Sequence, residues 1–366
     1  MAPLRRVARA CTTRHLLGLL AFAALVGATA WTTAARAAAK TLEIYFIDVE
    51  GGQATLIVTP AGESLLIDAG FPGDGTFASR PADPTAARDP QRILAAVHDA
   101  GISRIDYLMI THFHGDHDGG VVELSKLLPI VTFIDHSAPL PVADSGVPGT
   151  QALYDAYVQL RTHSAHLQPE PGDRLPLKGV RVDVVASGGA TLQAPLRGAG
   201  AANSSCTGSG LPAQEPYENP RSTGVKLTFG SFRFLDVGDL SGAPLFALAC
   251  PRNLVGEAEI YLVAHHGGID AADPATFNAV NPLVAIMNNG PTKGGSAETF
   301  ATLRQLPRTD TWQLHRSLTP GAVNFADDRT ANLNENTSAW IKVSARSDGS
   351  FTVTNGRNGV SKAYRR

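Results

Sequence analysis

The sequence predicts an α/β fold in which two sheets pack face to face with helices on their outer faces, a four-layer αββα sandwich with a long irregular insertion at about 137–222. Two observations predict it. β-branched and aromatic runs are followed by alternating helical and strand patterns, and the same succession occurs again further along the chain. A stretch rich in Gly, Ala, Ser and Pro separates the two halves. We expect residues 40–366 to form a single domain.

The first half opens with three expected strands, at 42–49, 54–59 and 63–69. The connection 50–53 between the first two has hairpin spacing. After a loop rich in Gly, Pro and Asp, Asp89 and Pro90 predict the start of a helix as its N-cap and first-turn proline, and Gly101 predicts its end.

The next expected strand, 105–110, is almost continuously apolar, which indicates burial on both faces. It leads directly into the sequence THFHGDHDGG at 111–120. A short helix at 121–128 and a strand at 130–134 follow. This alternation predicts the α/β part of the fold.

The insertion and the second half carry further predicted elements. Within the insertion we expect a helix near 153–164, a strand pair around 179–186 and an irregular segment at 187–220, which would act as a functional cover or a flexible insertion. In the second half we expect strands at 225–229, 232–237, 260–264, 284–287, 340–344 and 350–354, with helices near 274–279 and 297–303.

The net charge of −2 conceals an uneven distribution. Residues 1–39 hold five arginines and no acidic residue. Within this segment an apolar run at 16–30 precedes small residues around 35–39. This pattern predicts a secretory signal, because the run is shorter than the roughly 18 to 20 residues that a membrane-spanning helix needs. We therefore expect a secreted or periplasmic protein. The Arg5-Arg6 pair is only a weak match to a twin-arginine signal.

Removal of this leader leaves 26 basic residues against 33 acidic ones, a net charge of −7. Because phosphate contacts dominate nucleic-acid affinity, stable nucleic-acid binding is not expected, and a small-molecule substrate fits better. No apolar stretch of the mature chain reaches membrane-spanning length. The sequence carries no signal for an oligomeric state.

Two cysteines, Cys206 and Cys250, remain after the leader. An even number in an oxidising compartment is compatible with a disulfide, and two free, buried thiols are the alternative.

Three histidines and one aspartate follow the strand at 105–110 within six positions. At an extended strand end His112 and His114 point to the same side and can hold one metal ion together. Asp116 and His117 follow the turn at Gly115 and can face a second position. Imidazole and carboxylate ligands indicate Zn²⁺, one ion or two, with Mn²⁺ or Fe²⁺ as alternatives. A solvated turn that caps the next helix is the alternative without a metal.

Two later strands also end in ligand-type residues. Asp239 follows the strand at 232–237, and His265 and His266 follow the strand at 260–264. Two adjacent histidines cannot both point inward from an extended strand, so we expect one to be a metal ligand and the other its neighbour.

The motifs HxHxDH, GD and HHG, each after a strand and in this order, resemble those of the metallo-β-lactamase fold superfamily. The segments 46–54, 66–70 and 234–239 are similar to the ComEC-type branch, named for the hydrolase domain of competence proteins. The resemblance extends over about 42–287. HxHxDH is specific for this fold and much less specific for a substrate.

The resemblance implies two metal positions, with the ligands His112 and His114 for the first, Asp116, His117 and His265 for the second, and Asp239 bridging both. It also implies that Asp68 orients a ligand histidine, whereas Asp48 is as readily structural.

The usual third histidine of the first position has no clear match. His136 is a candidate, and His163 and His166 on the expected helix are poorer ones. Residues 219–222 occupy the stretch of the sequence where the resemblance places that third histidine. One tightly bound and one loosely bound metal ion is therefore an open alternative to two.

Such a site would activate water for hydrolysis. Asp116 or Asp239 would accept a proton and His266 would donate one to the leaving group, although His266 is as readily a packing residue. We expect a secreted metal-dependent hydrolase of a phosphodiester; the alternatives are hydrolysis of a lactone, thioester or β-lactam and, third, a non-catalytic binding module. Lys293 and Arg221 are candidate phosphate contacts, or ordinary surface charges.

Overall fold

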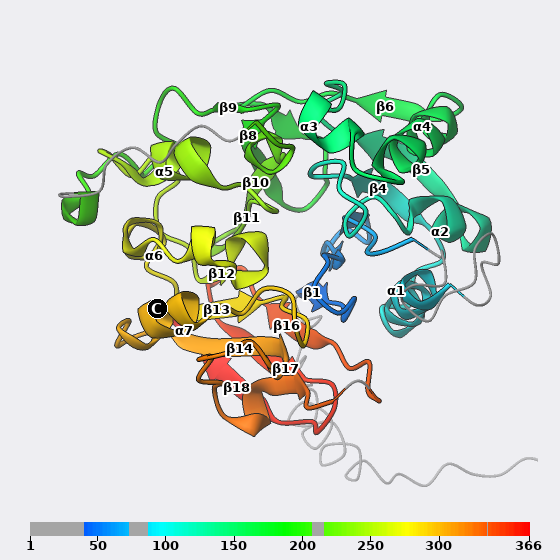
Figure 1. Cartoon of the computed structure of the whole chain (residues 1–366). Helices are drawn as coiled ribbons and strands as arrows, with labels where there is room; N and C mark the ends of the chain where they lie inside the picture. The colour runs from blue at the N-terminus through cyan, green and yellow to red at the C-terminus, as the bar shows by residue number, and fades with distance from the viewer. Residues whose placement is uncertain (1–39, 73–86, 207–215, 335) are drawn as a thin grey trace, which may run out of the picture. The chain divides into compact units, whose positions relative to one another are not determined.

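Two sheets form the centre of the computed structural model, which describes residues 40–72, 87–206, 216–334 and 336–366 (Figure 1). Within these residues the first sheet has nine strands, in the order β18 (Ser361–Tyr364), β17 (Phe351–Asn355), β16 (Ile341–Ala345), β1 (Leu42–Phe46), β2 (Thr55–Val58), β3 (Ser64–Ile67), β4 (Ile105–Met109), β5 (Ile130–Ile134) and β6 (Ala165–Leu167).

The second sheet also has nine strands within the described residues. Their order is β15 (Thr330–Asn332), β14 (Asp310–His315), β13 (Val284–Met287), β12 (Ile260–Leu262), β11 (Phe232–Asp236), β10 (Gly224–Phe229), β8 (Arg181–Ser187) and β7 (Arg174–Leu175), with β9 (Ala190–Thr191) paired to β8.

Strand direction determines where the loops with ligand-type residues meet. β1, β2 and β3 pair antiparallel, whereas β3 to β6 pair parallel in the first sheet and β11 to β15 pair parallel in the second. Residues that follow the carboxyl ends of neighbouring parallel strands share one edge of a sheet. The loops after β11 and β12 therefore share an edge of the second sheet, and the contact between His117 and Asp239 brings the turn after β4 of the first sheet to the same place.

Helices cover the outer face of each sheet. They are α1 (Arg88–Asp99), α2 (Val121–Leu127), α3 (Val142–Ser145), α4 (Thr150–Arg161), α5 (Gly242–Ala249), α6 (Pro274–Val280) and α7 (Ala297–Arg304). The described residues also contain five 3-10 turns: η1 (Ser204–Cys206), η2 (Asn219–Arg221), η3 (Ala264–Gly267), η4 (Ile269–Ala271) and η5 (Asp327–Arg329).

Three apolar cores separate the four layers. The central core lies between the sheets, where the rings of Phe46 and Phe234 are in edge contact at 5.7 Å and Trp312 is fully buried. A second core packs α1, α2 and α4 on the first sheet, and a third packs α5, α6 and α7 on the second. The predicted four-layer αββα sandwich is confirmed.

The segment 137–222 contains more regular structure than its composition predicts. It supplies α3, α4, η1 and η2, the edge strand β6 of the first sheet, and β7, β8 and β9 of the second. The expected helix near 153–164 lies at Thr150–Arg161. His163 and His166 therefore follow the helix instead of lying on it, and His166 belongs to β6.

Several elements were not predicted from the sequence. Helix α5 has the sequence GAPLFALA, which is apolar on every side and so lacks the amphipathic period of a surface helix. Strands β14 and β18 follow the last of the ligand-type motifs, and neither was predicted. The predicted leader at 1–39 lies outside the described residues, and none of the helices in the described part is long and apolar enough to cross a membrane.

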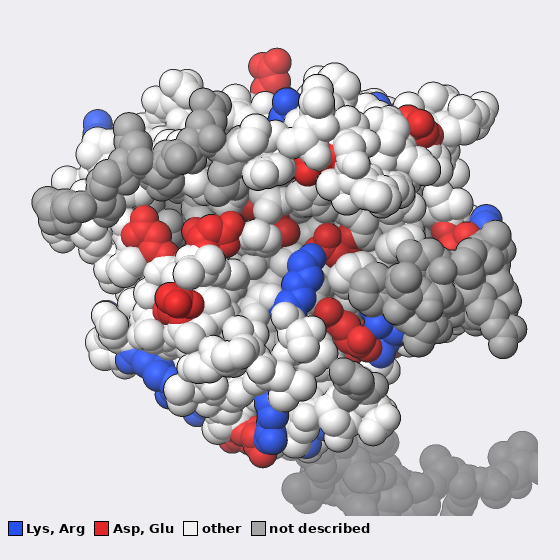
Figure 2. Space-filling view, in the orientation of Figure 1, with Lys and Arg blue, Asp and Glu red and all other residues white. Residues whose placement is uncertain are grey.

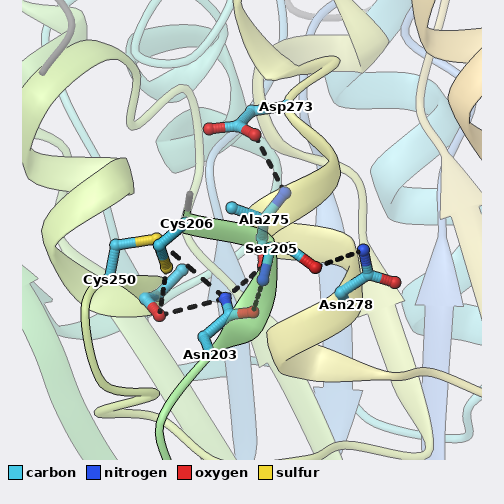
Figure 3. The surroundings of a disulfide bond; sticks show 8 residues. Asn203, Ser205, Cys206, Cys250, Asp273, Ala275 and Asn278 are labelled. Carbon is cyan, nitrogen blue, oxygen red and sulfur yellow. Dashed lines mark hydrogen bonds between the residues drawn. A yellow bond between two sulfur atoms is a disulfide. The ribbon is translucent and has the colours of Figure 1, made fainter. Parts of the chain in front are cut away.

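A disulfide joins Cys206 to Cys250, which confirms the pairing over the alternative of two free thiols (Figure 3). It ties η1 to the end of α5. The side-chain amide of Asn203 donates to the carbonyl oxygens of Ala249, at 3.1 Å, and Ala275, at 2.9 Å. The end of the segment 187–206 is thus fastened to the helices over the second sheet.

Candidate metal centre

The turn after β4 is held in place by Asp68, which follows β3. Its carboxylate accepts hydrogen bonds from the backbone N–H and the hydroxyl of Thr111, both at 2.8 Å. Asp68 Oδ2 also lies 2.7 Å from Nδ1 of His117. This contact orients the imidazole so that its Nε2 faces the second sheet, and a carboxylate on the far nitrogen of a ligand histidine is a common feature of metal sites.

Four buried side chains meet where the two sheets' loops converge, and we call them the four-ligand cluster: Asp116, His117, Asp239 and His266. Nε2 of His117 lies 3.2 Å from Asp116 Oδ2 and 3.2 Å from Asp239 Oδ2. Nε2 of His266 lies 3.2 and 3.1 Å from the same two oxygens, and 3.3 Å from Nε2 of His117.

These distances fit a divalent ion. Ligand atoms placed tetrahedrally at about 2.0 Å from a zinc ion are separated from one another by about 3.3 Å. The five measured separations in the four-ligand cluster are 3.1–3.3 Å. Oδ1 of Asp239 is also buried and has no hydrogen-bond partner among the described residues. The four side chains could hold one ion with two imidazoles and two carboxylates.

A second, looser group lies on the other side of Asp239. Nε2 of His112 lies 3.0 Å from Nδ1 of His114 and 3.9 Å from Asp239 Oδ2. Nε2 of His265 lies 3.6 Å from that same oxygen. Asp239 Oδ2 therefore lies between the two groups. From the wider spacing around Asp239 Oδ2 we expect the second position to bind a metal ion more weakly than the four-ligand cluster.

The adjacent histidines take the opposite places to those that the resemblance implies. His266, not His265, contributes its Nε2 to the four-ligand cluster, while His265 lies at the edge. The chain leaves the extended conformation at η3, where both histidines adopt positive φ, 47° at His265 and 53° at His266. Such left-handed geometry at two successive non-glycine residues is strained and is concentrated at functional sites. This backbone conformation directs the His266 imidazole into the four-ligand cluster, whereas a continued strand would point it away.

The electrostatics of the cluster favour ionised carboxylates. Burial opposes ionisation of Asp116, but Lys293 and His117 hold its pKa well below the usual range. Burial also opposes ionisation of Asp239, whose pKa is held low by His117 and His266. Although burial lowers it, the pKa of His117 is raised well above its usual value by Asp239, Asp116 and Asp68. Negative charge in the cluster thus attracts either protons or a cation.

His265 is in a different electrical setting. Burial lowers its pKa, but the carboxylates of Asp239 and Asp270 raise it to about 9. Nδ1 of His265 lies 2.6 Å from Asp270 Oδ2, and Nε2 lies 3.3 Å from the amide nitrogen of Asn219. Asn219 belongs to η2, so the 219–222 stretch does border the site.

The candidates for a third histidine at the first position do not reach it. His136 is buried against the ring of Phe113, and its Nε2 lies 3.2 Å from Glu218. His166 contacts Asp135 at 3.1 Å. His114 instead gains Asp144, whose Oδ1 lies 2.9 Å from its Nε2. The turn is not solvated, since His112 and His117 are fully buried.

Of the two candidate basic residues, only Lys293 reaches the cluster. Its ammonium contacts Asp116 Oδ2 and lies 5.5 Å from the centre of the Phe71 ring. Arg221 points elsewhere and donates to the carbonyl oxygen of Pro139 at 2.8 Å.

A second group of ligand-type residues was not predicted as a unit, and we call it the arginine-bound cluster: Asp48, Glu50 and His315. Nε2 of His315 lies 2.6 Å from Asp48, Arg88 pairs with Glu50 at 2.7 Å, and Arg92 pairs with both acids. His315 ends β14, and only the recognition of that strand could have drawn attention to it.

Comparison with known proteins agrees with the geometry. Residues 47–200 match the family described as the metallo-beta-lactamase superfamily. Together with the two-sheet sandwich, this match shows that the chain has the metallo-beta-lactamase fold. The ComEC-type branch stays a prediction.

Individual relatives are distant. A UPF0173 protein of Pyrococcus abyssi is 26% identical over 233 residues, which cover 61% of this chain and 84% of that protein. Igni18, a metallo hydrolase from Ignicoccus hospitalis, is 16% identical with a TM-score of 0.41, over 78% of this chain and all of that one. A HARLDQ-motif mutant of a metallo-beta-lactamase from Cronobacter sakazakii is 19% identical with a TM-score of 0.33; the match covers 53% of this chain and 60% of that one, so this chain spans about three fifths of its length.

Proposed function

We propose that the protein is an exported, metal-dependent hydrolase of small phosphodiesters. The observation that carries the proposal is the four-ligand cluster with the ammonium of Lys293 beside it. A cation next to a metal centre suits a substrate with a negatively charged centre. The ComEC-like segments support the same substrate class.

The surface charge supports a small substrate, and the disulfide supports export. On the face shown in Figure 2, basic side chains are scattered and form no continuous track of the kind that a nucleic-acid polymer requires. The Cys206–Cys250 disulfide supports an oxidising compartment. We therefore favour a small substrate met outside the cytoplasm.

Each residue has a role that follows from its contacts. A Zn²⁺ ion held by the four-ligand cluster would supply Lewis acidity and make a hydrolytic water available near neutral pH. Asp239, whose Oδ1 has no hydrogen-bond partner in the described part of the chain, could accept a proton at that atom. Lys293 would contact a non-bridging oxygen of the phosphodiester.

His265 replaces His266 as the candidate proton donor. Asp270 holds its Nδ1, which leaves Nε2 directed toward Asn219 and Asp239 at the edge of the site. His266 is committed to the cluster through the same nitrogen that a donor would need.

Metal analysis and a substrate panel test the proposal. Purified protein should contain between one and two equivalents of zinc, manganese or iron. Bis-p-nitrophenyl phosphate or p-nitrophenylphosphorylcholine should be hydrolysed, and Asp116→Ala should lower the rate about a thousandfold. Asp348→Ala, which removes a carboxylate 53% exposed on the far C-terminal turn, is the matched control and should retain activity.

Two results would contradict the proposal. Protein without bound metal after mild purification would exclude a metal-dependent hydrolase. Turnover of nitrocefin or an acyl lactone alone, abolished by Asp116→Ala, would assign the site to the other ester or amide class.

A further inference from the structure

A pocket of about 500 Å³ opens beside the four-ligand cluster. Its walls are largely apolar and come from the segment after β3 and from the start of α4; they include Phe71, Pro72, Pro148, Ala152 and Leu153. A volume of this size lies within the range of small-ligand sites.

The pocket is continuous with the candidate metal centre through Asp116. This residue belongs to the four-ligand cluster and also lines the pocket. Lys293 stands at the junction, because its ammonium contacts Asp116 while lying 5.5 Å from the centre of the Phe71 ring. A ligand at this junction would meet positive charge on one side and apolar side chains on the other.

The glycines of the THFHGDHDGG turn bring the pocket walls close to the metal ligands. A Cβ at Gly119 would lie only 2.5 Å from Pro72, and a Cβ at Gly115 only 3.2 Å from Leu153. The backbone N–H of Phe71 is fixed by a 2.8 Å hydrogen bond to Asp89. Both walls therefore pack directly on the ligand-bearing turn.

We propose that this pocket is the subsite for an apolar substituent of the substrate, which makes the substrate an amphiphilic diester. Its anionic centre lies at the four-ligand cluster and Lys293, and its aryl or short alkyl group fills the pocket. The inference rests on the proposed function and specifies its substrate class. Removal of a phenyl group from water into such a pocket is expected to strengthen binding about tenfold or more.

Esters that differ only in one substituent test the pocket in the metal-loaded enzyme. The methyl, hexyl and phenyl esters of p-nitrophenyl phosphate share a leaving group, and KM for the phenyl ester should be about tenfold lower than for the methyl ester. Ala152→Trp places an indole at the pocket wall and should abolish that difference. Gln159→Trp, at an exposed position further along α4 that does not line the pocket, is the control and should preserve it.

Calorimetric titration separates this inference from the proposed function, since phosphonates are bound without turnover. Phenylphosphonate should bind about tenfold more tightly than methylphosphonate, and Ala152→Trp should equalise the two affinities. Lys293→Gln should weaken both phosphonates by a similar factor.

The outcomes are distinguishable. Selective binding of phenylphosphonate without turnover of any phosphodiester would support the subsite and overturn the proposed function. Equal affinities for both phosphonates in the wild-type protein, or unchanged selectivity in Ala152→Trp, would overturn the subsite.

Discussion

The four-ligand cluster and the arginine-bound cluster are built from the same kinds of side chain, yet their neighbours differ. In the arginine-bound cluster, Arg92 lies 3.1 Å from Asp48 and 2.9 Å from Glu50, and Arg88 adds a second guanidinium. In the four-ligand cluster, one ammonium reaches Asp116 and both carboxylates otherwise face imidazoles. Two guanidinium groups already neutralise Asp48 and Glu50, whereas a single ammonium reaches the four-ligand cluster, so we expect a metal ion in the four-ligand cluster.

The two clusters are mechanically linked by the loop 50–53. The backbone N–H of Gln53 donates to the carbonyl oxygen of Asp116 at 3.1 Å, and a Cβ at Gly52 would lie 2.4 Å from that oxygen. The arginine pairs at Glu50 hold one end of this loop. The arginine-bound cluster thus supports the turn that presents Asp116.

Loss of Asp239 should have the largest effect. Asp239→Ala removes the oxygen that lies within 3.2 Å of both His117 and His266, so metal content should fall toward zero and hydrolysis about a thousandfold. Asp48→Asn should keep the wild-type metal content. Elemental analysis of both variants tests the comparison, and it fails if Asp48→Asn loses an equivalent of metal.

Loss of the disulfide should have the second-largest effect. It should lower the stability of the fold without changing metal binding. Cys206→Ser combined with Cys250→Ser opens a loop with a sequence separation of 44, which should lower the free energy of unfolding by about 3 to 4 kcal/mol. Metal content should be unchanged, because neither cysteine touches either cluster. Urea unfolding with and without reductant measures the effect; wild-type protein in reductant should match the variant.

Loss of an arginine should cost stability and leave the metal in place. Arg92→Met leaves the fully buried Asp48 short of a counter-charge, and we expect a loss of about 2 kcal/mol. Arg104→Met, which removes an arginine whose side chain is 63% exposed, is the control and should cost at most about 1 kcal/mol. Equal stability of the two variants in denaturant titrations would show that the arginine-bound cluster is not a support.

The smallest expected effect is the dependence of stability on pH through the protonation of His265. In metal-free protein His265 should titrate near pH 9, because Asp239 and Asp270 raise its pKa above the ordinary 6.5. A raised pKa in the folded state means that this stabilisation is complete below pH 6.5 and is lost as pH rises through about 9. Asp270→Asn should lower the pKa of His265, so that the stabilisation is lost over a narrower pH range. Imidazole NMR titration provides the measurement, and titration near 6.5 in wild-type protein would refute the expectation.

The local part of the site was predictable because its residues are neighbours in the chain. His112, His114, Asp116 and His117 follow one buried strand, and a strand end followed by a glycine turn brings them together over a few residues. Asp239 was predictable from a related pattern, since it follows a buried strand in the same manner as the HxHxDH motif does. The choice between His265 and His266 was not, because it depends on the left-handed backbone at η3, which is imposed by packing.

Long-range contacts account for the rest. Arg88 and Arg92 meet Asp48 because α1 covers the first sheet, and His315 meets it because β14 lies in the second. Phe71 and Leu153 line one pocket although 82 positions separate them in the sequence. Residue types at such distances carry no mutual signal in one sequence.

The sequence by itself determined the αββα fold, the disulfide candidates and most of the ligand-type residues, because hydrophobic period and motif spacing are local properties. Tertiary structure decided which histidine enters the four-ligand cluster, which acidic cluster is neutralised by arginines, and where the apolar pocket opens. These outcomes depend on the packing of distant elements, and packing alone determines which lone pairs, charges and apolar surfaces remain available to a ligand.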